Sequence, residues 1–126
     1  MTKEKFLDPN IANKSKTVEE KIQFFEYNNT KLPLPTEIEI SESGTCNRTC
    51  SFCPRSAPNF IDKKEFISNE LHQKLCTELQ KLNYKGTIRY SGFVEPLLDK
   101  NIYNLINMVR NSLPECNIEM VTNGDP

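Results

Sequence analysis

Three closely spaced cysteines, Cys46, Cys50 and Cys53, stand in the run CNRTCSFCP. The C-x3-C-x2-C spacing places three thiolates on one short loop, where they can bind a single metal centre. Three ligands are one fewer than a closed tetrahedral site or a four-iron cluster requires. The missing ligand leaves an open coordination position, so this loop indicates a metal centre at which chemistry can take place.

The composition excludes several classes of protein. The 126 residues are enough for one small domain, and the net charge of −1 provides no basic field for nucleic acid. The polar N-terminal residues contain neither the apolar segment of a signal peptide nor a membrane span. We therefore expect a cytoplasmic chain with no nucleic-acid partner and no membrane association.

The total of five cysteines is odd, which argues against a secreted disulfide scaffold. Cys76 and Cys116 lie far from the cysteine loop in the sequence. Each falls in or beside an apolar segment, so we expect both to be buried structural thiols.

Residues 1–34 are expected to be an N-terminal leader with a short helix. Thr17 and Glu20 match a capping box, and apolar residues follow at helical spacing, which predicts a helix from about 17 to 27. Pro33 and Pro35 prevent the helix from resuming.

Strand and helix patterns alternate over residues 35–126. Strands are predicted over 36–40, 87–91 and 117–122. A first helix is predicted to be capped by Ser68 and stopped by Gly86, and a second to be capped by Asp99 and to end at Pro114. The buried stripe of the first helix is predicted to be Leu71, Leu75, Leu79 and Leu82. This order favours an α/β fold with parallel strands, in which the loops after the strands meet at one edge.

The predicted strands alternate apolar with charged side chains, whereas strands buried on both faces are usually apolar throughout. One sheet face therefore suits the helices. The other sheet face is charged. Either it lines a water-filled cavity that holds a polar ligand, or it is simply exposed to solvent.

Two further motifs are the Glu95-Pro96 loop and the tripeptide Thr122-Asn123-Gly124. Read with the cysteine loop, they resemble the front part of the radical S-adenosylmethionine (radical SAM) enzymes. Cys46, Cys50, Phe52 and Cys53 match that family's C-x3-C-x-aromatic-C signature. The run SGFVEPLL, residues 91–98, is similar to its Gly-Gly-Glu turn, with Val94 where glycine is frequent. Pro54 is common in the branch that carries C-terminal auxiliary-cluster (SPASM/twitch-like) domains. The resemblance covers about residues 35–126.

The resemblance implies a partial (β/α) barrel, a 4Fe–4S cluster held by the three cysteines, and S-adenosylmethionine on the fourth iron. It implies cofactor contacts from Phe52, Gly92, Glu95 and Asn123, with no catalytic residue separable from the cofactor site. It also implies reductive cleavage of S-adenosylmethionine, an external flavodoxin- or ferredoxin-like electron donor and radical chemistry on a substrate that the motifs do not identify.

Three interpretations complete the expectations. The chain is expected to be an N-terminal portion of such an enzyme, truncated after the third strand and inactive alone, or else a small protein completed by a partner or by self-association. The alternative function is that of a non-catalytic module that holds zinc or an iron–sulfur cluster. Arg48, Arg55 and His72 are expected to be exposed to solvent, although either arginine could tune the cluster or bind an anionic substrate.

Overall fold

The computed structural model describes residues 19–125 and divides the chain into two compact units, Met1–Thr36 and Glu37–Pro126. In the first unit, β1 (Phe24–Tyr27) and β2 (Thr30–Pro33) form an antiparallel hairpin. The turn between them is made by Asn28 and Asn29, with φ angles of 48° and 61°. Two consecutive positive φ angles are typical of the type I′ turn, whose twist matches that of a hairpin.

The helix predicted from about 17 to 27 is therefore wrong over Phe24–Tyr27, which is a strand. Of the described residues in this stretch, Glu19, Glu20 and Lys21 are helical, and Thr17 of the capping box lies outside the described part of the chain. The physical reason is the Asn-Asn pair, because asparagine tolerates the left-handed region and so closes a hairpin where a helix end was expected.

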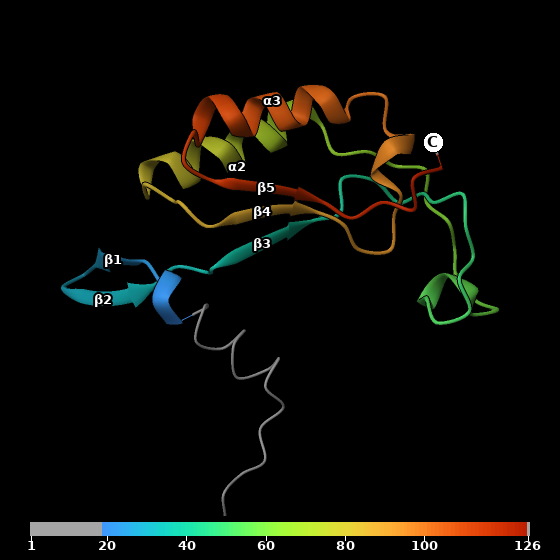
Figure 1. Ribbon diagram of the computed structural model, residues 1–126, viewed down its shortest axis with the longest axis horizontal. Helices are drawn as coiled ribbons and strands as arrows, with labels where there is room; N and C mark the ends of the chain where they lie inside the picture. Colours follow the sequence, from blue (N-terminus) through green and yellow to red (C-terminus); the bar gives the residue numbers. More distant parts are fainter. Residues whose placement is uncertain (1–18, 126) are drawn as a thin grey trace, which may run out of the picture. The chain divides into compact units, whose positions relative to one another are not determined.

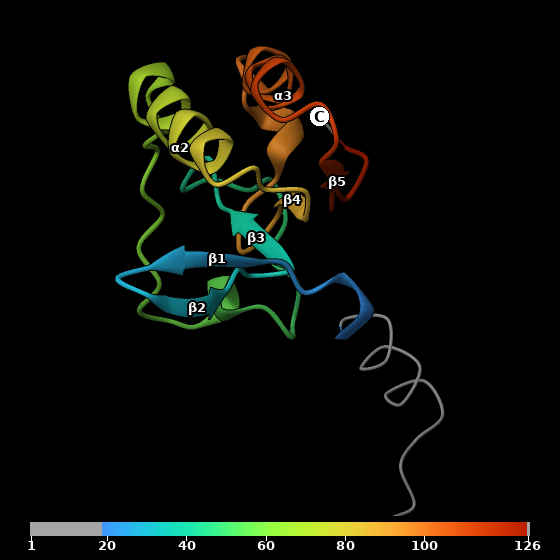
Figure 2. The same cartoon turned by 90° about the vertical axis from the view of Figure 1, so that its left-hand side faces the viewer.

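The second unit is built on a three-stranded parallel sheet with the order β3 (Glu37–Ile40), β4 (Thr87–Tyr90) and β5 (Asn117–Met120). Two helices, α2 (Asn69–Lys81) and α3 (Ile102–Ser112), connect the strands and both cover one face of the sheet (Figures 1 and 2). Short 3₁₀ turns, η1 (Pro54–Ser56) and η2 (Pro96–Leu98), lie in the loops that follow β3 and β4. The prediction of an α/β fold with parallel strands is confirmed.

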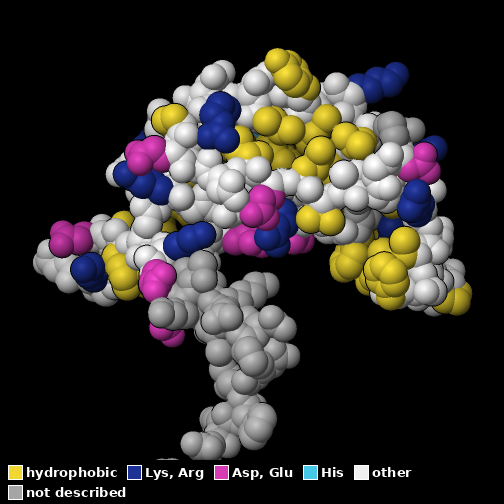
Figure 3. Space-filling view, in the orientation of Figure 1, with side chains coloured by type: hydrophobic (Ala, Val, Ile, Leu, Met, Phe, Trp, Pro, Cys, Tyr) yellow, Lys and Arg dark blue, Asp and Glu magenta, His cyan; other side chains and the backbone are white. Residues whose placement is uncertain are grey.

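The apolar face of the sheet packs against the helices. Ile88 and Tyr90 of β4 are almost fully buried, as are Leu105 and Val109 of α3. The opposite face is charged, and Arg89 at its centre bonds Glu37 and Glu119 on the two flanking strands. Figure 3 shows acidic and basic side chains gathered below the strands. Alternation along each strand thus separates a core face from a polar face.

The buried face of α2 differs from the predicted leucine stripe. His72, Cys76 and Leu79 are buried, whereas Leu71 is 57% exposed. The prediction that His72 is exposed is wrong, because its Nε2 lies 2.9 Å from the Tyr90 hydroxyl and its ring stacks on that tyrosine. A buried histidine with a hydrogen-bond partner is an acceptable core residue.

The ends of the two helices agree in part with the sequence signals. The Ser68 side chain caps α2 as predicted, by accepting a hydrogen bond from Leu71 N–H at 3.1 Å. The helix ends before Gly86, however, and Asn83 takes the left-handed conformation there. Asp99 precedes α3 and accepts a hydrogen bond from the N–H of Asn101, which is the N-cap residue.

No helix among residues 19–125 is long and apolar enough to cross a membrane.

Candidate functional site

The loops that follow β3, β4 and β5 meet at the carboxyl edge of the sheet and enclose a cavity of about 220 Å³. All seven residues to which the sequence assigned a metal or cofactor role line this cavity: Cys46, Cys50, Phe52, Cys53, Gly92, Glu95 and Asn123. The predicted juxtaposition therefore holds, and it follows from the rule that the carboxyl ends of parallel strands share one edge.

The cysteine loop presents three free, half-buried thiols to the cavity. Its turns are fixed by backbone hydrogen bonds from Cys53 to Cys50 and from Ser56 to Cys53, both 2.9 Å long. The Cys46 Sγ accepts a hydrogen bond from the Arg48 N–H at 3.5 Å. Phe52 is 89% exposed, so its ring stands at the rim of the cavity and does not pack the loop.

The donor set fits a metal centre with an open position. The residues that line the cavity offer three thiols but no imidazole and no fourth thiol. Their only carboxylate, that of Glu95, is already hydrogen-bonded. Within the described part of the chain, no three metal-ligating side chains are gathered closely enough to bind a metal ion. The thiols share one cavity without being drawn together, so binding of a metal would require their side chains to converge.

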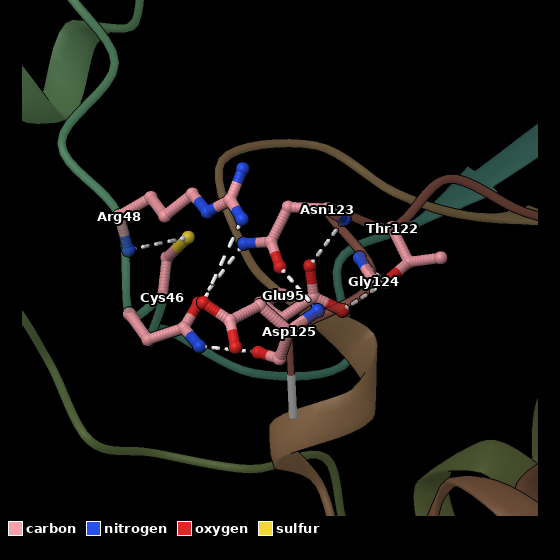
Figure 4. Close-up of polar contacts among 8 residues, drawn as sticks. Cys46, Arg48, Glu95, Thr122, Asn123, Gly124 and Asp125 are labelled. Atoms are coloured by element: carbon pink, nitrogen blue, oxygen red, sulfur yellow. Dashed lines mark hydrogen bonds and ion pairs between the residues drawn. The ribbon is translucent and has the colours of Figure 1, made fainter.

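Glu95 joins the ends of two strands (Figure 4). Its side chain is 1% exposed. Its Oε1 accepts hydrogen bonds from Leu97 N–H at 3.0 Å and from the Thr122 hydroxyl at 2.5 Å, and its Oε2 accepts one from Asn123 N–H at 2.7 Å. The Glu95 N–H in turn donates to the Thr45 carbonyl, just before the first cysteine.

These contacts hold the Glu95 carboxylate in its charged form. Burial raises the pKa of Glu95, but the hydrogen bonds from Thr122, Asn123 and Leu97 and the charge of Arg48 outweigh that effect, so the pKa lies below its usual value. Oε2 accepts a single bond and can accept a second. A contact between Glu95 and a cofactor therefore stays a prediction.

Asn123 connects the end of β5 to the cysteine loop. Its Nδ2 donates to Asn47 Oδ1 at 2.9 Å, and its Oδ1 accepts from Asp125 N–H at 2.9 Å. The Asn47 amide also donates to the Asp125 carbonyl. Arg48 forms an ion pair with Asp125 at 3.6 Å, with both side chains half exposed or more, which agrees with the predicted exposure of Arg48. Asparagine at this position thus holds the third loop against the first.

Gly92 is required by the close approach of the first two loops. Its φ is +112°, and a Cβ on this residue would lie 2.2 Å from Ser41 Oγ. Only glycine adopts this conformation without strain, and only glycine leaves room for the serine.

Two residues of the site were missed by sequence reasoning. Arg55 was expected to be solvated, but its side chain is 7% exposed and it lines the cavity, so that expectation is wrong. Thr122 binds the Glu95 carboxylate. The sequence places Arg55 two residues after Cys53, within reach of the loop, but gives no signal for the direction of its side chain.

Comparison with known proteins gives related sequences and structures. No family model matches the chain. An S-adenosyl-L-methionine-dependent 2-deoxy-scyllo-inosamine dehydrogenase of Niallia circulans is 33% identical over 88 residues, which are 70% of this chain and 35% of that protein. The crystal structure of BtrN in complex with AdoMet and 2-DOIA matches with a TM-score of 0.68 and 32% identity, covering 73% of this chain and 37% of that one. BtrN in an open conformation matches with a TM-score of 0.65 at 32% identity, covering 73% of this chain and 40% of that one.

These findings correct the family assignment made from the motifs. No family model matches the chain, and the relationship that the comparisons support is to this S-adenosylmethionine-dependent dehydrogenase. The relative is named as dependent on S-adenosyl-L-methionine, which is the cofactor that the motifs implied. The expectation of a relationship to an enzyme is confirmed, and the chain spans about a third of that enzyme's length.

Proposed function

We propose that this chain forms the cofactor-binding part of an S-adenosylmethionine-dependent enzyme that works by radical chemistry. The observation that carries the proposal is a single cavity at the carboxyl edge of the sheet. Three thiols of the loop after β3 line it, together with the loops after β4 and β5. An 88-residue stretch of the chain is 33% identical to a dehydrogenase named for its dependence on this cofactor.

In this proposal Cys46, Cys50 and Cys53 hold three irons of a 4Fe–4S cluster, and S-adenosylmethionine occupies the fourth. When both groups are bound, the reduced cluster would supply one electron to the sulfonium of S-adenosylmethionine. Cleavage of a carbon–sulfur bond would then give methionine and a carbon radical able to abstract hydrogen from a substrate carbon. The Arg48 N–H stabilises the Cys46 thiolate through the hydrogen bond to its Sγ. Phe52, exposed at the rim, offers a flat apolar surface for the adenine.

The loop after β4 receives the methionine end of the cofactor. Its backbone carbonyls are acceptors, which is the chemistry an amino group requires. Glu95 keeps a full negative charge beside these carbonyls because its pKa lies below the usual value. Its bonds to Thr122 and Asn123 set the distance between this loop and the end of β5.

The exposed rim also bears on the source of the electron. Phe52 stands beside the cysteines with most of its surface open to solvent. We propose that an external flavodoxin- or ferredoxin-like protein approaches this rim and reduces the cluster. We also propose that the sheet belongs to a partial (β/α) barrel, whose inner surface is the polar face that carries Arg89.

Anaerobic reconstitution of the purified chain with iron and sulfide tests the proposal. The expected result is about four irons and four sulfides per chain, with an absorption or electron paramagnetic resonance spectrum that changes when S-adenosylmethionine is added. A site filled by zinc, or a cluster whose spectrum ignores the cofactor, would refute the enzyme and support the non-catalytic metal module.

A further inference from the structure

Arg55 makes the most extensive side-chain contacts in the loops around the cavity. It lies in η1, two residues after Cys53. Its Nη1 donates to the carbonyls of Gly44 at 3.2 Å and Phe93 at 3.0 Å, and its Nη2 forms an ion pair with Asp62 Oδ1 at 2.8 Å. The guanidinium also lies over the Phe60 ring, 4.9 Å from its centroid.

These contacts join parts of the site that are distant in sequence. Gly44 lies two residues before the first cysteine, Arg55 two residues after the last, and Phe93 in the middle of the loop after β4. One guanidinium therefore connects both ends of the cysteine loop to the loop expected to bind the methionine end of the cofactor. Asp62 and Phe60 hold that guanidinium from the segment that leads toward α2.

The chemistry of arginine suits this position. A nearly buried charge must be paired and hydrogen-bonded, and Arg55 meets both conditions through Asp62 and two carbonyls. The planar fork presents donors in several fixed directions at once, whereas lysine presents one compact ammonium. Arg48 lines the same cavity but forms its ion pair at 3.6 Å with its side chain 50% exposed. Of the two arginines near the cysteine loop, Arg55 is therefore nearly buried and closely paired, whereas Arg48 is half exposed and more loosely paired.

We infer that Arg55 is a positioning residue that fixes the cysteine loop against the loop after β4. It sets the separation between the thiols and the backbone carbonyls, and so the alignment of the cofactor between them. The role in cofactor alignment rests on the proposed function, whereas the mechanical role belongs to the chain itself. The two can be tested separately.

Hydrogen exchange of the full chain without metal tests the mechanical role. Arg55→Lys is compared with Arg110→Lys, because Arg110 also donates to two backbone carbonyls, those of Pro114 and Cys116, but lies outside the cavity. We expect Arg55→Lys to speed exchange of the Gly44, Cys53 and Glu95 amides by about tenfold, as a local opening would. Arg110→Lys should leave these amides unchanged. Equal protection in wild type and Arg55→Lys would overturn the inference.

Asp62→Asn provides a second variant that keeps Arg55 in place. It removes the charge that holds Nη2 but preserves the size of the side chain. The same amides should exchange faster, by a smaller factor than in Arg55→Lys. Unchanged exchange in this variant would show that the ion pair does not hold the guanidinium and would count against the inference.

Cofactor titration of the reconstituted chain tests alignment. Arg55→Lys should keep its iron content, while the S-adenosylmethionine concentration that gives half of the spectral change rises roughly tenfold. Arg110→Lys should match wild type. An unchanged midpoint in Arg55→Lys would overturn the alignment role. A wild-type chain that shows no response to the cofactor would instead overturn the proposed function, and the exchange experiment would still decide the mechanical role.

Discussion

Replacing Glu95 with glutamine removes one charge from the centre of the site and changes little else in size. The carboxylate is 1% exposed and accepts three hydrogen bonds, from Leu97, Thr122 and Asn123. Glutamine has one oxygen and one NH₂ group, so one of the two acceptor positions becomes a donor. If that NH₂ group faces Asn123 N–H, two donors oppose each other, and if it faces Leu97 N–H, the same conflict arises there.

The cost follows from these contacts. One charge-assisted hydrogen bond is lost, the remaining bonds become neutral, and a buried NH₂ group is left without an acceptor. Together these effects should lower the free energy of unfolding by about 2–4 kcal/mol. The matched control is Glu115→Gln, which breaks an exposed ion pair with Lys85 and should cost about 0–1 kcal/mol.

Urea unfolding followed by circular dichroism measures both variants. Because the pKa of folded Glu95 lies below its usual value of 4.5, the unfolded chain takes up a proton first as the pH falls. The stability that this carboxylate contributes is therefore complete above that value and is lost as the pH falls through the folded pKa. Glu95→Gln should lack this part of the acid sensitivity. Equal losses of stability in Glu95→Gln and Glu115→Gln would refute the account of the site's central carboxylate.

Three further changes have expected outcomes. Alanine in place of any one of the three loop cysteines should abolish iron incorporation, measured by metal analysis, whereas Cys76→Ala should retain it; loss of iron from the latter would show that the ligands are wrongly assigned. Gly92→Ala should lower the free energy of unfolding by about 1–3 kcal/mol in urea titration, since the new Cβ meets Ser41 Oγ at a positive φ, and wild-type stability would contradict that geometry. Burial raises the pKa of Glu42 from 4.5, so the folded state binds the extra proton and stability falls as the pH rises above that value. Glu42→Gln should reduce this fall above pH 4.5, and an unchanged pH profile would exclude Glu42 as its cause.

Several features of the fold could be predicted because they follow from local patterns. The alternation of strand and helix signals correctly indicated a parallel sheet, and the switch between apolar and charged residues separated its two faces. The buried face of α2 could not be predicted from leucine spacing. His72 fits the core because Tyr90, on the strand that follows α2, offers a hydroxyl to its ring. The hairpin was missed because its turn depends on two asparagines at positive φ, a signal weaker than Asn-Gly.

The site residues that belong to a sequence motif could be predicted. A residue whose partners come together only in the folded chain could not. The three cysteines, Gly92 and Asn123 come to one cavity, as the order of strands required. Arg55 could not be placed in this way, because its partners Gly44 and Phe93 become neighbours only after the loops fold over one another. A long side chain near a motif can equally stay half exposed, as that of Arg48 does.

The most direct test of the central claim is electron–nuclear double resonance on the reduced, reconstituted chain with S-adenosylmethionine labelled at its methionine amino nitrogen and carboxylate oxygen. The account predicts hyperfine coupling between the cluster and both labels, since three thiols leave one iron for them. The account would be contradicted if neither label coupled to the cluster and a side chain of the polypeptide gave a signal on that iron.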